Sequence, residues 1–114
     1  MKLSANLPQL SKNEFEVFLL IYAAHVDYEF SEEEIAFILK KTDQDTFDRM
    51  NDLFNNIADF TSLKIIIIYK NLYYKTKAEE DRILELLTEL FTVDGDFSRI
   101  EKVFVPFFKR MTNF

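Results

Sequence analysis

The chain has 114 residues, of which 48% are apolar and 13 are phenylalanines, so we predict one domain over residues 1–114 with an aromatic-rich core. A net charge of −6 disfavours nucleic acid and anionic membrane surfaces as partners, and the absence of cysteine excludes disulfides and thiolate metal sites. One glycine and two prolines leave too little turn chemistry for a hairpin-rich β protein, which favours helices joined by short loops.

Two capping boxes mark the first two predicted helices. Ser11 with Glu14 begins a helix that we expect to run from about residue 12 to about residue 26. Ser31 with Glu34 begins a second helix, which should end near Lys40–Lys41, where cations complement the helix dipole. Apolar residues at spacings of three and four give the first helix a buried stripe of Phe15, Phe18, Leu19 and Tyr22.

The middle of the chain predicts a third and a fourth helix. Thr42 or Asp43 caps the third helix, in which phenylalanine and methionine recur at helical spacing. The fourth should begin near Thr61–Ser62 and contains Ile65–Ile68, a β-branched run that would also suit a strand. We predict a helix because its neighbours are helical and no second strand is available to pair with it. Since it is apolar all round, we expect it to be the central buried helix, with the phenol tips of Tyr69, Tyr73 and Tyr74 at the surface.

The last part of the chain predicts two more helices. The fifth should run from Lys77 to about Val93, with Gly95 at its C-terminal end. A third capping box over residues 98–101 begins the sixth helix, which Pro106 should kink or split.

A nine-residue pattern occurs twice. Val-Asp-x-[Glu/Asp]-Phe-Ser-x-x-Glu covers residues 26–34 and again residues 93–101, at a constant offset. A repeated unit of this kind predicts a duplicated helix-turn-helix, within an all-α bundle of about six helices.

The acidic residues of the two turns have two competing interpretations. In the structural one, Glu34 and Glu101 only cap helices, and the aspartates form local turns. In the other, the turns hold a divalent cation such as Ca²⁺, Mg²⁺ or Mn²⁺, because clustered carboxylates repel one another and a hard cation relieves that repulsion. The candidate metal ligands are Asp27, Glu29, Glu34, Asp94, Asp96 and Glu101. An EF-hand is excluded, because the twelfth position of either loop would be Ile38 or Val105 instead of glutamate.

The second turn matches the Asp-Gly-x-[apolar]-x-x-x-Glu pattern at residues 94–101, and the first matches it except for Tyr28 in place of the glycine. On these turns and their spacing the chain resembles the TerB-like family, named for a tellurite-resistance protein. The resemblance implies a helical, duplicated, stress-associated module of the cytoplasm, with Asp27, Glu34, Asp94 and Glu101 suspected of binding metal.

No catalytic arrangement is recognisable. The single histidine, His25, should satisfy carbonyls at the end of the first helix, and one histidine excludes a di-iron bundle of the Glu-x-x-His type. We therefore expect a non-catalytic module that binds a cation. The alternative is a scaffold that binds protein partners, and a metal-dependent hydrolase is the hypothesis that the sequence favours least. No signal peptide is visible and the Ile65–Ile68 run is too short to span a bilayer, so we expect a cytoplasmic protein that does not insert into membranes.

Overall fold

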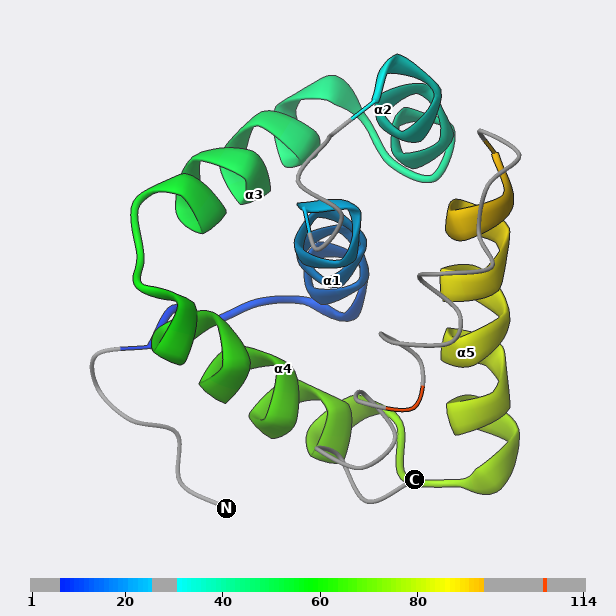
Figure 1. Ribbon diagram of the computed structural model, residues 1–114. Helices are drawn as coiled ribbons and strands as arrows, with labels where there is room; N and C mark the ends of the chain where they lie inside the picture. Colours follow the sequence, from blue (N-terminus) through cyan, green and yellow to red (C-terminus); the bar gives the residue numbers. More distant parts are fainter. Residues whose placement is uncertain (1–6, 26–30, 94–105, 107–114) are drawn as a thin grey trace.

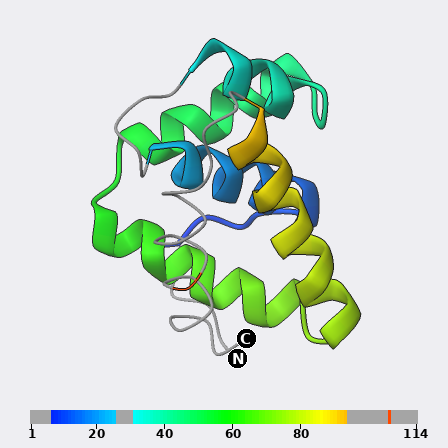
Figure 2. The same ribbon diagram turned by 45° about the vertical axis from the view of Figure 1, so that its right-hand side comes forward.

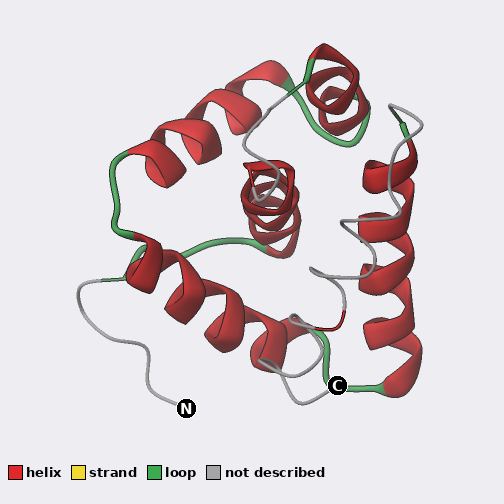
Figure 3. Cartoon of the chain, in the orientation of Figure 1, coloured by secondary structure: helices red, strands yellow, loops and turns green. Residues whose placement is uncertain are grey.

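The structure is a computed structural model that describes residues 7–25, 31–93 and 106. These residues form five helices and no strand (Figure 3), so the predicted all-α class is confirmed. The helices are α1 (Lys12–His25), α2 (Glu32–Leu39), α3 (Gln44–Asn55), α4 (Asp59–Tyr73) and α5 (Lys77–Thr92). The predicted sixth helix and the second acidic turn lie outside the described residues, apart from Pro106, which is helical. The internal duplication therefore stays a prediction.

Helix α1 lies at the centre of the fold, and the other four helices form a ring around it (Figure 1). Figure 2 shows α1 between α3 and α4, with α5 closing one side, and α1 contacts each of the other helices. Every residue from Val17 to Ala24 is buried, so α1 has no solvent face over this stretch. The radius of gyration of 13.3 Å is that of a well-packed globular chain of this length.

The prediction that the isoleucine-rich helix is central was wrong. Helix α4 buries Ile65, Ile66 and Tyr69 but exposes Lys64 and Asn71 on its opposite face. It therefore packs as an outer helix with one buried side, because α1 offers an apolar surface in every direction and α4 does not.

Local capping sets where most of the helices begin. In the first box the Ser11 amide donates to Glu14 Oε1 (2.8 Å), and the Glu14 amide donates to Ser11 Oγ (3.1 Å). Asp43, and not Thr42, caps α3, since its carboxylate accepts from the Thr46 amide at 2.7 Å. These bonds satisfy amides that the first turn of a helix otherwise leaves without partners.

Helix α4 begins earlier than the predicted start at Thr61–Ser62. Its first residue is Asp59, and its N-cap, Ala58, makes no side-chain capping bond. Ser62 is instead buried within the first turn, where its amide donates to the Ala58 carbonyl (3.1 Å). Helix α4 contacts α1, and burial together with the nearby Asp59 carboxylate at the start of α4 raises the pKa of Tyr22 on α1 to about 12. Tertiary packing at this point therefore outweighs the local capping signal.

Two tyrosines of α4 hold the segment that leads into α1. Tyr69 donates its hydroxyl hydrogen to the Pro8 carbonyl (2.7 Å) and accepts from the Leu10 amide (2.9 Å). Tyr73 donates to the Leu10 carbonyl at 2.7 Å. The expectation that the phenol tips lie at the surface was therefore wrong for Tyr69, which is buried with its hydroxyl bonded inward, and for Tyr74, which is fully buried. A buried phenol must find a partner, and the irregular backbone before α1 supplies it.

Candidate functional site

Of the six predicted metal ligands, only Glu34 lies within the described residues. The other five, which lie outside them, are Asp27, Glu29, Asp94, Asp96 and Glu101. Among the residues that the structure does describe, no group of three or more acidic or histidine side chains is arranged to hold a metal ion.

Glu34 closes a complete capping box at the start of α2. Its Oε1 accepts from the Ser31 amide (3.0 Å) and from Ser31 Oγ (3.2 Å), while the Glu34 amide donates to Ser31 Oγ (3.1 Å). The residue is 2% exposed. This is the arrangement that the structural interpretation of the acidic turns predicts for this residue.

His25 occupies the last turn of α1, as predicted. Its Nδ1 lies 2.8 Å from the Ile21 carbonyl oxygen, and its ring lies against Phe54 of α3 with ring centroids 4.5 Å apart. The prediction that it satisfies a carbonyl at this helix end is confirmed.

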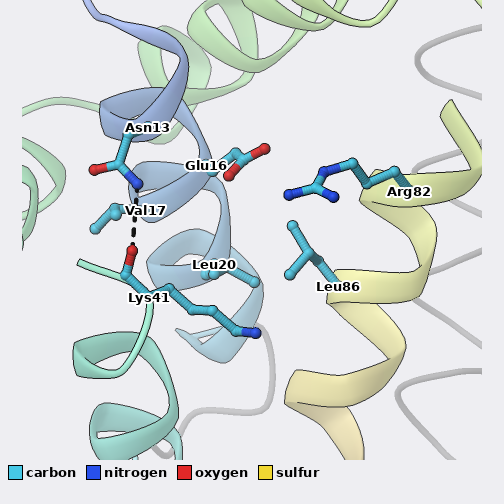
Figure 4. Close-up of a pocket in the computed structure, with 7 residues that line it drawn as sticks. All are labelled: Asn13, Glu16, Val17, Leu20, Lys41, Arg82 and Leu86. Carbon is cyan, nitrogen blue, oxygen red and sulfur yellow. Dashed lines mark hydrogen bonds between the residues drawn. The ribbon is translucent and has the colours of Figure 1, made fainter. Parts of the chain in front are cut away.

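A cavity of about 200 Å³ lies between α1, α5 and the loop after α2 (Figure 4). Its apolar lining comes from Val17 and Leu20 of α1 and Leu86 of α5. The complete lining is Asn13, Glu16, Val17, Leu20, Lys41, Arg82 and Leu86. It therefore combines an apolar surface with one carboxylate and two cationic side chains.

The loop that carries Lys41 is fixed to α1 by Asn13. The Asn13 side-chain amide donates to the Lys41 carbonyl (3.4 Å) and its oxygen accepts from Thr42 Oγ1 (3.0 Å). Both ends of this amide are thus occupied, so Asn13 positions the loop and the lysine that it carries.

Glu16 is held on the cavity wall by Tyr74. The fully buried Tyr74 donates its hydroxyl hydrogen to Glu16 Oε2. Burial, and then the hydrogen bond to Glu16, raise the pKa of Tyr74 well above its ordinary value, while Arg82 opposes the shift. Tyr74 therefore stays a neutral donor at physiological pH.

The charged side chains of the cavity face one another without pairing. Glu16 on α1 and Arg82 on α5 point toward each other across it, and Lys41 reaches in from the loop (Figure 4). The ion pairs found among the described residues include none made by these three side chains. A neighbouring hollow of about 150 Å³ shares Lys41, Arg82 and Leu86 and adds Glu85 and Glu89.

The outer face of α4 is the second notable surface. Phe60 is 67% exposed and Leu72 is 46% exposed, and the half-buried Ile67 and Ile68 lie between them in the helix. Lys64 lies over the Phe60 ring, 4.9 Å from its centroid. We call Phe60, Lys64, Ile67, Ile68 and Leu72 the outer face of α4.

Sequence reasoning missed the cavity and one buried cation. The sequence indicates only that Lys41 lies at the end of the second helix, and Glu16 and Arg82 belong to no motif. The fold alone brings these three residues together. Lys70 is buried and pairs with Glu80 of α5 at 3.6 Å, with side chains 6% and 18% exposed. The sequence contains one indication that Lys70 is buried. It follows Ile66 by four residues, and residues four apart lie on the same face of a helix.

Comparison with family models, curated proteins and solved structures gives no match for this chain. No helix among the described residues is both long and apolar enough to cross a membrane.

Proposed function

We propose that this chain is a non-catalytic module that binds a protein partner through the outer face of α4. The observation that supports this is the exposure of Phe60 and Leu72 on a helix whose intervening isoleucines are only half-buried. Single exposed apolar residues are ordinary, but two on one helix with half-buried isoleucines between them extend the apolar surface along the helix, and such surfaces mark interaction sites. The Glu34 capping bonds support the same proposal, because they give that carboxylate a structural role that needs no ion.

The partner that fits this face is an amphipathic helix with an apolar stripe bordered by carboxylates. Lys64 is the charged side chain in the middle of the face, and Lys75 and Lys77 are exposed just beyond the C-terminal end of α4. Charges more than about 8 Å apart are largely screened at physiological ionic strength, so these local lysines outweigh the overall charge of −6. A second copy fits poorly, because pairing two α4 helices would bring together like-charged lysines and two chains of −6.

A photo-crosslinking amino acid at position 60 tests the proposal in cells that express the chain. Position 33 on α2 is the matched control, because Glu33 is also exposed on a helix away from α4. We expect position 60 alone to crosslink to an acidic amphipathic helix, and Lys64→Glu to weaken binding of that helix as a purified peptide about tenfold. Crosslinks only to a second copy of the chain, or equal crosslinks from both positions, would refute the proposal.

The second candidate function is divalent-cation binding by the two acidic turns, in the stress or signalling context that the TerB-like resemblance implies. The observation in its favour is the repetition of the Asp-to-Glu spacing at residues 27–34 and 94–101. A cation that binds only the folded chain stabilises it by about 2.7 kcal/mol at a hundredfold excess over its dissociation constant.

Thermal unfolding after chelation, then with Ca²⁺, Mg²⁺ or Mn²⁺ added, tests this candidate. We expect a saturable rise in the midpoint with one ion, which is lost in Asp27→Asn/Asp94→Asn and kept in Asp48→Asn/Asp52→Asn on the exposed side of α3. An identical midpoint with and without each ion would exclude it.

A further inference from the structure

We propose that the cavity between α1 and α5 binds a single free α-amino acid with a short apolar side chain. The inference is independent of the outer face of α4. It rests on the types of side chain that line the cavity, on how they are held, and on the size of the cavity.

The charges of the lining match a zwitterion. Arg82 on α5 can bind a carboxylate, and Glu16 on the α1 wall that faces it can accept hydrogen bonds from an ammonium group, while Lys41 adds a second positive charge at the other end of the cavity (Figure 4). A simple carboxylate would leave Glu16 facing a like charge, and a simple amine would face two cations. A ligand that carries both groups on one carbon satisfies both walls, and the structure shows the two walls facing each other without an ion pair (Figure 4).

The remaining lining defines the side chain of the ligand. Leu86 is half-buried on α5 and presents a branched apolar group to the cavity, while Val17 and Leu20 of α1, 0% and 2% exposed, lie beneath it. Branched aliphatic groups pack well against such a surface and lose contact with water there. The volume of about 200 Å³ lies below the roughly 300–1,000 Å³ of sites for drug-sized molecules, which limits the ligand to about one amino acid.

The Glu16 carboxylate and the backbone that carries Lys41 are held by hydrogen bonds before a ligand arrives. The Tyr74 hydroxyl fixes the Glu16 carboxylate, and Asn13 fixes the backbone at Lys41. Groups that are already ordered lose little conformational entropy on binding, which favours affinity for a small ligand. Glu85 and Glu89, in the adjoining hollow, add negative charge near Arg82 and disfavour ligands with more than one carboxylate.

Isothermal titration of the full chain with L-leucine is the direct test. We expect saturable binding at concentrations up to about 10 mM, with Arg82→Gln and Glu16→Gln each weakening it about tenfold or more, since each loses a charge-assisted hydrogen bond. The matched controls Arg49→Gln and Glu33→Gln make the same chemical changes at exposed positions outside the cavity and should bind L-leucine as the wild type does.

Two analogues divide the ligand into its charged groups. L-Leucinamide lacks the carboxylate and 4-methylpentanoate lacks the ammonium group, so both should bind wild type more weakly than L-leucine. Removing the ammonium group should have little further effect in Glu16→Gln, because its partner is already absent. Far-UV circular dichroism checks that each variant is folded. Thermal unfolding gives a second readout, because L-leucine should raise the unfolding midpoint of the wild type but not that of Arg82→Gln.

The proposal fails if L-leucine gives no saturable signal in either assay. It also fails if either analogue binds as tightly as L-leucine, because the cavity would then recognise one charge only. Equal binding of L-leucine to wild type and to Arg82→Gln would likewise place any binding elsewhere.

Discussion

Replacing Tyr69 with phenylalanine removes one oxygen atom from the fold and with it two hydrogen bonds. The Tyr69 hydroxyl donates to the Pro8 carbonyl and accepts from the Leu10 amide, and both Tyr69 and Leu10 are buried. The ring contacts with Phe15 and Tyr73, each at a centroid distance of 5.7 Å, stay available to phenylalanine. The substitution therefore isolates the contribution of the hydroxyl.

The expected loss of unfolding free energy is about 2 kcal/mol. A buried amide without a partner costs about 1–3 kcal/mol, and the half-buried Pro8 carbonyl can recover part of its loss from water. In a domain of this size, about 2 kcal/mol lowers the unfolding midpoint by roughly 8 °C. Tyr73→Phe, which removes one bond at a half-buried tyrosine, should cost only about 1 kcal/mol.

Urea unfolding of the wild type, Tyr69→Phe and Tyr73→Phe measures these differences. Amide hydrogen exchange gives a local readout, because the Leu10 amide should lose protection in Tyr69→Phe and keep it in Tyr73→Phe. Equal costs for the two variants, together with unchanged protection of the Leu10 amide in Tyr69→Phe, would refute the role that we assign to the Tyr69 hydroxyl.

Three further predictions concern other parts of the fold. Glu80→Gln should lower the unfolding free energy by about 2 kcal/mol in urea titrations, because it leaves the buried Lys70 without this carboxylate; no loss would show that the pair is dispensable. The hydrogen bond from the Ser11 amide holds the pKa of Glu14 below its ordinary value. The ionised Glu14 carboxylate therefore stabilises the fold above its unfolded-state pKa, and this contribution is lost as the pH falls through its folded-state pKa. The unfolding free energy of Glu14→Gln should accordingly fall less steeply than that of the wild type below about pH 4.5. Phe60→Ser should change the unfolding free energy by less than about 0.5 kcal/mol, and a larger loss would show that Phe60 packs within the fold.

Features that depend on a few neighbouring residues were predictable from the sequence. The capping boxes at Ser11 and Ser31 and the helix start at Lys77 lie where the local pattern places them. Capping joins residues three positions apart, so the sequence contains both partners. The start of α4 departs from its local signal, since the helix begins at Asp59 after Ala58, which makes no side-chain capping bond that a sequence pattern could indicate.

Neither the central position of α1 nor the cavity could be predicted from local sequence patterns. The run Ile65–Ile68 is more apolar than any other four residues, but burial on all sides depends on what the other helices surround. Glu16, Lys41 and Arg82 come from three elements that are distant in sequence, and each is an ordinary charged residue by itself. The outcome of the metal prediction depends on Asp27, Asp94 and their neighbours, which lie outside the described residues.

The central position of α1 has a consequence for how the chain emerges from the ribosome. Translation delivers α1 before any of the helices that surround it, and the side lined by Val17 and Leu20 gains its covering helix only when α5 is complete. At about 5–20 residues per second, the apolar surface of α1 stays partly uncovered for several seconds. A nascent chain stalled before α5 should therefore recruit holding chaperones more strongly than one stalled after it.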